Sequence, residues 1–148
     1  MKKLKGFSIV EVIILIAIVV IIVFVAMPKF NMLIRRSNEG MTRGNLASLR
    51  SAISIYYGEN DGNFPGNNIA EVLVNDEGKY IDSIPFAYCP PYHHRNNVIL
   101  TGIDFPTESA NTGGWGYKDS DNGTGRNWGE IWINCTHTDS RGIIFSEY

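Results

Sequence analysis

The most constraining feature of this 148-residue chain is an apolar run near its amino terminus. The 21 residues from Phe7 to Met27 are all apolar except Ser8 and Glu11. As a helix at about 1.5 Å per residue, the run would measure about 31 Å, close to the ~30 Å hydrocarbon core of a bilayer. Isoleucine and valine dominate it and favour strands in water, but a single span in lipid must bond its backbone internally. We therefore predict one membrane-spanning helix.

Positive charge before the run predicts its orientation. Lys2, Lys3 and Lys5 precede it, and lysines beside a span hold that end in the cytoplasm. The rest of the chain is expected to face outward. The alternative is an ordinary secretory signal, which would have a shorter apolar region and a small-residue cleavage site that the stretch 24–28 does not supply convincingly.

Glu11 is the one charged residue inside the run. An acidic group in a spanning helix costs about 2.5 to 3.5 kcal/mol even on a lenient insertion scale. Two explanations are open at this point. Either Glu11 lies one turn into the helix and reaches the lipid headgroups, or it neutralises a cation once copies of the chain pack together.

The junction Lys5-Gly6-Phe7-Ser8-Ile9-Val10-Glu11 resembles the leader junction of type IV prepilins. A short basic leader ends in glycine, phenylalanine follows, and a glutamate comes four residues later, before the unbroken apolar run. The resemblance implies that prepilin peptidase cleaves between Gly6 and Phe7 and methylates the new amine of Phe7. It also implies that Glu11 is needed for assembly. One departure is Val20, which stands where pilins commonly carry a helix-breaking glycine.

The residues after the run predict that the helix continues. From Lys29 onward the composition is charged and mixed, and apolar residues recur at spacings of three, four and three, which places them on one helical face. These residues are Leu46, Leu49, Ile53 and Tyr56. With Gly58 as a natural carboxyl-terminal cap, the helix is predicted to end at Tyr57.

Pro28 lies at the end of the apolar run. Because proline removes one helical hydrogen bond, Pro28 either bends the helix or marks the boundary between its membrane and periplasmic halves. The predicted organisation is a leader peptide at 1–6, a transmembrane and assembly helix at 7–28, the periplasmic half of a helical spine at 29–58 and a globular β-rich head at 59–148.

The head is predicted to contain one short helix and several strands. The helix is expected at 69–74, and the strands are expected at 80–84, 97–103, 113–117, 128–135 and 141–148. A loop of Asp, Asn and Gly separates 113–117 from 128–135, so these two should pair as a hairpin. Their GGWGY and WGEIWIN sequences also resemble the heads of bacterial pilins and type II secretion pseudopilins. The predicted fold class is α+β, the type IV pilin fold, with a long amino-terminal helix packed on a small antiparallel β-sheet head.

Cys89 and Cys135 would lie in an oxidising space if the head faces outward, so a disulfide is the natural interpretation. Closing a loop whose ends are 46 positions apart would restrict the unfolded chain and so stabilise the fold by about 4 kcal/mol in the entropy model. The alternative is two separate buried thiols. His93 and His94 follow Cys89, but adjacent histidines rarely converge and neither Cys-x-x-Cys nor His-x-x-x-His occurs, so we expect no metal or nucleophile site there.

Asp119 and Asp121 stand in a glycine-rich turn, with Glu130 eleven positions after Asp119. That spacing is similar to a calcium loop, although Thr124 occupies the place of the EF-hand's glycine. Some pseudopilin heads bind calcium in a comparable loop. A solvated hairpin loop and a calcium site using Asp119 and Asp121 are both open, and no other cofactor is expected.

The charge of the head argues against binding nucleic acid. From Ser51 onward there are five basic and 13 acidic residues, a net charge of −8. Such a head repels phosphate backbones, so no specific nucleic-acid site is predicted. A membrane-anchored hydrolase would need a convergent nucleophile and base, which the sequence does not show. The chain is therefore predicted not to be an enzyme.

The resemblance implies a structural subunit that polymerises with itself into a type IV pilus, a filament used for adhesion, twitching motility or DNA uptake. Its other partners would be prepilin peptidase and the assembly machinery of the inner membrane. The subunit would lie in the inner membrane before assembly and in an extracellular filament afterwards. The alternative is a pseudopilin of a type II secretion system, which forms a short periplasmic structure.

Overall fold

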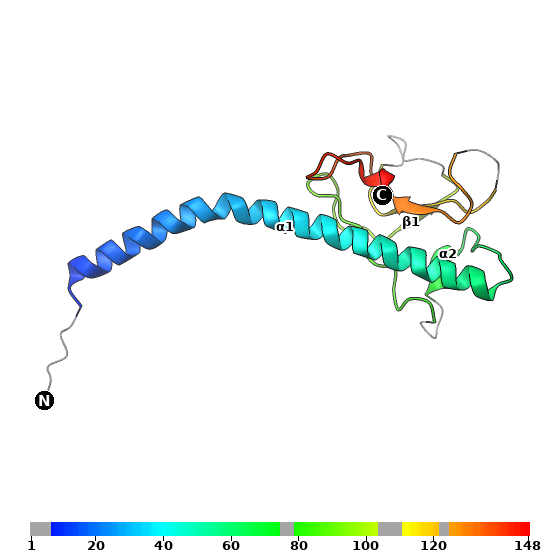
Figure 1. Ribbon diagram of the computed structural model, residues 1–148, viewed down its shortest axis with the longest axis horizontal. Helices are drawn as coiled ribbons and strands as arrows, with labels where there is room; N and C mark the ends of the chain where they lie inside the picture. The colour runs from blue at the N-terminus through cyan, green and yellow to red at the C-terminus, as the bar shows by residue number, and fades with distance from the viewer. Residues whose placement is uncertain (1–6, 75–78, 104–110, 122–124) are drawn as a thin grey trace, which may run out of the picture. The chain divides into compact units, whose positions relative to one another are not determined.

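The computed structural model describes residues 7–74, 79–103, 111–121 and 125–148. The chain divides into two compact units, Met1–Ile34 and Arg35–Tyr148. One helix, α1 (Ile9–Glu59), contributes to both (Figure 1). Gly6 and the rest of the predicted leader lie outside the described residues.

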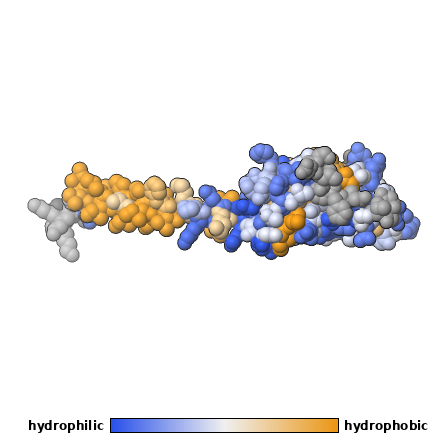
Figure 2. Space-filling model, turned by 90° about the horizontal axis from the view of Figure 1, so that it is seen from above, coloured by the Kyte–Doolittle hydropathy of each residue, from blue (hydrophilic) through white to orange (hydrophobic). Residues whose placement is uncertain are grey.

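In the first unit, α1 carries an apolar surface that is almost wholly exposed (Figure 2). Every described residue up to Ile34 is exposed except Ala26, which is half-buried. Among the described residues, α1 is the one helix long and apolar enough to cross a membrane. Its length, composition and exposure fit a membrane anchor or a signal sequence, which agrees with the prediction of a spanning helix in its coarser form.

The helix begins directly after Ser8, whose carbonyl accepts hydrogen bonds from the amides of Glu11 (3.0 Å) and Val12 (3.2 Å). Pro28 lies inside the helix, which continues past it. The missing proline N–H therefore weakens α1 locally without ending it. A bend at Pro28 stays a prediction.

In the second unit, α1 packs its predicted apolar face against the head. Leu46, Leu49 and Ile53 are buried, and Tyr56 packs against the same cluster, so the predicted face is confirmed. The helix ends at Glu59 rather than at Tyr57, and the predicted cap, Gly58, lies within its last turn.

The actual stop is made by the turn that follows. Both the amide and the side chain of Asn60 donate to the Tyr56 carbonyl, at 3.0 and 2.8 Å. The amide of Gly62, which has a φ of 79°, donates to the Tyr57 carbonyl at 3.0 Å. These bonds satisfy carbonyls that the helix end leaves free, with glycine supplying the left-handed backbone.

A three-stranded sheet forms the β part of the head. Its order is β1 (Ile99–Thr101), β2 (Trp115–Tyr117), β3 (Ile131–Ile133). Strands β2 and β3 pair antiparallel, so the predicted hairpin is confirmed. Strand β1, inside the predicted 97–103, pairs parallel to β2, so the sheet is mixed and the all-antiparallel prediction was wrong. A parallel pair cannot be joined by a tight hairpin turn, so β1 and β2 do not form a hairpin.

Two predicted strands do not form, whereas the predicted short helix does, as α2 (Ile69–Leu73). The segment 80–84 lies in bends and irregular chain. The segment 141–148 contains the 3-10 helix η1 (Phe145–Glu147) and one isolated bridge, Thr138 to Ile144. The carboxylate of Asp139 accepts the amides of Arg141 (2.7 Å) and Ile143 (3.1 Å), and these bonds fold the chain into a turn where a strand was expected.

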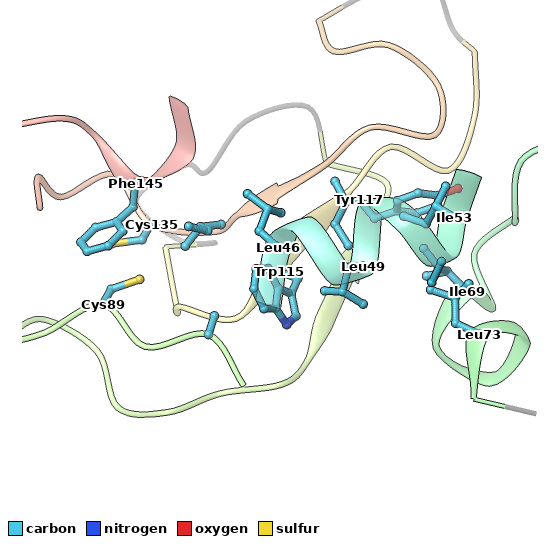
Figure 3. Packing of buried hydrophobic residues seen from close by; sticks show 14 residues of the cluster. Leu46, Leu49, Ile53, Ile69, Leu73, Cys89, Trp115, Tyr117, Cys135 and Phe145 are labelled. Atoms are coloured by element: carbon cyan, nitrogen blue, oxygen red, sulfur yellow. The ribbon is translucent and has the colours of Figure 1, made fainter. Parts of the chain in front are cut away.

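The core lies where α1, α2 and the sheet meet (Figure 3). The largest apolar side chains in it are fully buried, and the polar atoms of the two central aromatics on β2 are satisfied. The Trp115 indole donates to the Pro85 carbonyl at 2.8 Å, and the Tyr117 hydroxyl donates to the Pro65 carbonyl at 2.7 Å. These bonds tie the loops on either side of α2 to the sheet.

Gly116, at the centre of β2, gives a prediction about stability. A Cβ at this position would lie 2.3 Å from Cε2 of Trp132, whose indole is fully buried and has the Arg126 guanidinium 4.6 Å from its ring centroid. Gly116→Ala should therefore destabilise the protein by about 1 to 3 kcal/mol or more, since a packed core does not yield that much space. Denaturant unfolding monitored by tryptophan fluorescence measures it.

Gly58→Ala is the matched control, because its new methyl would meet nothing within 4 Å and the residue lies in α1. It should be neutral or stabilise by up to about 1 kcal/mol. Equal unfolding midpoints for the two variants would contradict the packing argument at Gly116.

Candidate functional site

The amino-terminal end of the described chain presents an apolar ring followed by one carboxylate. Phe7 precedes α1 and is 75% exposed. Glu11 stands in the first helical turn and is also exposed. The partial positive charge of a helix amino terminus favours a carboxylate there. Among the described residues, none of the ion pairs involves Glu11.

Further along the first unit, a shallow groove follows one face of α1. It is lined by Ile21, Ile22, Val25, Ala26 and Lys29. The spacing of these residues, one and four apart, marks a single stripe of the helix surface, and four of the five are apolar. Such a stripe can pack against lipid or against the ridge of another helix.

The predicted disulfide partners are brought together in the second unit. Cys89 and Cys135 are both buried and are free thiols in this structure. Their side chains are hydrogen-bonded to one another, and Figure 3 shows them facing each other at one end of the core. The structure thus brings together the two residues that the sequence paired, and the covalent bond itself stays a prediction.

The contact between the thiols separates their pKa values. The hydrogen bond with Cys135 and burial raise the pKa of Cys89 far above its usual range. The same hydrogen bond lowers the pKa of Cys135, and His137 and His93 lower it further. Cys135 is therefore the sulfur that deprotonates first.

Two histidines converge on Cys135. A ligand atom of each of His93, Cys135 and His137 lies within 4.8 Å of those of the other two. His94 is exposed and lies outside the group. From the sequence, only the neighbours His93 and His94 were considered as ligands, and His137 was missed. The signal that could have found it is the pairing of Cys89-x-x-x-His93 with Cys135-x-His137, which becomes visible once the two cysteines are placed together.

The candidate calcium residues lie after β2. Asp119 is half-buried and accepts the Ser120 hydroxyl at 3.2 Å, and Asp121 is exposed. Glu130 is engaged elsewhere, since one oxygen pairs with Arg126 and the other accepts the Asn127 amide at 3.2 Å. Residues 122–124 lie outside the described part of the chain, and within that part Asp119 and Asp121 join no group of three convergent ligands. Calcium binding stays a prediction.

Comparisons with protein-family models, curated proteins and solved structures give no match to this chain.

Proposed function

We propose that this chain is a structural subunit of a type IV pilus filament, held in the inner membrane before assembly and polymerised through its amino-terminal helix. The observation that carries the proposal is the exposed apolar part of α1, which extends from Ile9, close to Phe7, to Ile34. Glu11 is the one acidic residue in it. The prepilin-like junction Gly6-Phe7 precedes that surface in the sequence.

The exposed apolar surface of α1 must be buried against lipid or protein. Large apolar side chains are exposed along almost every turn of α1 between Ile9 and Ile34. A soluble monomer rarely leaves so large a contiguous apolar surface in water, because burying it is favourable by roughly 25 cal/mol per Å². Lipid covers this surface before assembly, and the helices of neighbouring subunits cover it in the filament.

Apolar contact alone does not specify how the helices meet, because lipid tails are as apolar as the side chains they replace. Leader removal creates a charged amine at Phe7, four residues before Glu11. We propose that this amine pairs with the Glu11 carboxylate of an adjacent subunit. Each charge would be costly alone in a low-dielectric core, so the pairing sets the axial register.

The subunit acts by assembly and not by catalysis in this proposal. Its partners are other copies of itself, prepilin peptidase and the inner-membrane assembly machinery. The same features would serve a pseudopilin of a type II secretion system, whose fibre is short, periplasmic and scarce. The amount and location of fibre separate the two functions.

Processing tests the proposal directly. Gly6→Ala should block or slow removal of the leader, because family peptidases read the small residue at the cut while the lysines hold it on the cytoplasmic side. Mass spectrometry of the membrane fraction should find wild-type chain beginning at Phe7, without its three leader lysines and with a net charge of −5. Ser8→Ala, on the other side of the cut, serves as the control and should be processed normally. A mature terminus other than Phe7 would count against the assignment.

A further inference from the structure

Two short segments of the head each present one thiol and one imidazole. In the first, the Cys89 carbonyl accepts the amides of Tyr92 (2.9 Å) and His93 (3.1 Å), and these two bonds close a tight turn that contains the cis Pro90–Pro91 bond. The turn returns the chain at His93 to the neighbourhood of Cys89. In the second, directly after β3, Cys135 Sγ lies 3.5 Å from His137 Nδ1.

The spacing between these groups fits a tetrahedral metal ion. With Zn–S near 2.3 Å and Zn–N near 2.05 Å, a sulfur and a nitrogen on one tetrahedral zinc are separated by about 3.6 Å. Cys135 and His137 already stand at that separation. His93 completes a set whose ligand atoms all lie within 4.8 Å, so shifts of about 1 Å would close it. Cys89 lies outside this group of three, but its thiol contacts Cys135, so a larger shift of its side chain would bring it in as the fourth ligand.

The surroundings of His93 select the tautomer that a metal needs. The Asn111 Oδ1 atom accepts the Thr136 amide at 3.2 Å, and Asn111 Nδ2 donates to the Thr136 hydroxyl at 2.7 Å, so its amide orientation is fixed. The same Oδ1 lies 3.2 Å from His93 Nε2 and can only accept, so Nε2 carries the proton. The lone pair of Nδ1 is then free, and the Asn111 contact is the outer-shell bond that metal-binding histidines usually make.

His137 is held in place as well. The Tyr92 ring stacks on its imidazole at 3.9 Å between centroids with an interplanar angle of 8°. Its backbone carbonyl accepts the amide of Phe145 at 3.0 Å. The two sulfurs are buried and the two rings are half-buried, so the cluster is largely shielded from water yet open to an entering ion.

We propose that the thiols of Cys89 and Cys135 and the imidazoles of His93 and His137 form a transition-metal site that takes Zn²⁺ in a tetrahedral two-sulfur, two-nitrogen set. Borderline and soft ions prefer this donor combination. Binding replaces two S–H bonds with two Zn–S bonds and releases two protons to water. The site uses the same sulfur atoms as the disulfide predicted from the sequence, so each chain holds one or the other.

Metal titration of the full chain in detergent tests the site. After reduction with a phosphine and removal of metal, Co²⁺ should bind one per chain with the intense visible bands of tetrahedral cobalt and a thiolate-to-cobalt charge-transfer band. Zn²⁺ should displace it. His93→Ala and His137→Ala should each weaken Zn²⁺ binding by more than about 100-fold, beyond the 10- to 100-fold loss typical of an outer-shell partner. His94→Ala, next to the site but outside it, should bind as the wild type does.

The cobalt spectrum of the wild-type chain tests the proposed metal site even if a variant misfolds. A reduced chain with no tetrahedral cobalt spectrum overturns the proposal, and so does equal loss of binding in His94→Ala and His93→Ala. If the chain is isolated with Cys89 and Cys135 joined in a disulfide, binding of one Zn²⁺ per chain after reduction supports the metal site, and no binding after reduction overturns it.

Discussion

Replacement of Glu11 by glutamine should abolish assembled fibre while the processed, membrane-held subunit stays at its normal amount. The substitution keeps the shape of the side chain and removes its charge, which leaves the amine of Phe7 unpaired in the helical core of a filament. Breaking one partner of a buried ion pair costs about 3 to 5 kcal/mol, which corresponds to at least about a 100-fold loss per subunit addition. Membrane insertion should be retained. An exposed carboxylate within an apolar helix opposes insertion, and the substitution removes that charge.

The measurement is the ratio of sheared fibre to membrane-held subunit, both quantified by immunoblot. Glu11→Val, which also makes the span more apolar, should behave like Glu11→Gln. Glu71→Gln removes the same charge from an exposed position on α2 and should leave the ratio unchanged. Normal fibre yield in either Glu11 variant would contradict the proposed charge pairing. Glu11 would then be a tolerated residue at the membrane interface.

The second large effect is expected at Asp139, whose side chain is fully buried. One carboxylate oxygen accepts the amides of Arg141 and Ile143. The other accepts the Tyr148 hydroxyl, the Arg141 side chain at 3.1 Å and, at 3.4 Å, the side chain of Arg43 on α1. Asp139 therefore joins the helix to the carboxyl-terminal segment through a network that leaves neither oxygen unsatisfied.

Asp139→Ala should destabilise the protein by about 3 to 5 kcal/mol, a large part of the 5 to 15 kcal/mol typical of a whole domain. Two backbone amides would lose their acceptor, and the Arg43 guanidinium would lose its charged partner and keep the Tyr148 hydroxyl at 3.2 Å. Urea unfolding of the full chain in detergent measures the change. Asp82→Ala, at an exposed position, is the control and should stay within about 0.5 kcal/mol of wild type. A loss below 1 kcal/mol at Asp139 would show that water or rearranged side chains replace the network.

Those parts of the fold that depend on local pattern could be predicted from the sequence. The unbroken apolar run demanded a helix, and the spacing of Leu46, Leu49 and Ile53 identified its buried face. The glycine- and aspartate-rich loop before Trp128 indicated a hairpin, and β2 and β3 form it. Each of these features is set by neighbours within a few residues, where periodicity and turn chemistry act.

The features that the sequence missed depend on distant partners. The parallel pairing of β1 with β2 joins segments that are not neighbours in the sequence, and no local pattern reports it. The strand expected at 141–148 does not form, because the Asp139 side chain accepts backbone amides that a strand would use for pairing. His93 and His137 are 44 positions apart, so their convergence on Cys135 could be seen only after the cysteines were placed.

The central claim is that the chain builds a filament, and electron microscopy of material sheared from the cell surface tests it most directly. Mass spectrometry of the same material identifies the subunit. The proposal predicts long fibres composed of this chain, with N-methylated Phe7 as the first residue. Processed chain confined to the cell envelope, with no surface fibre containing it, would contradict the pilus assignment and favour the pseudopilin instead.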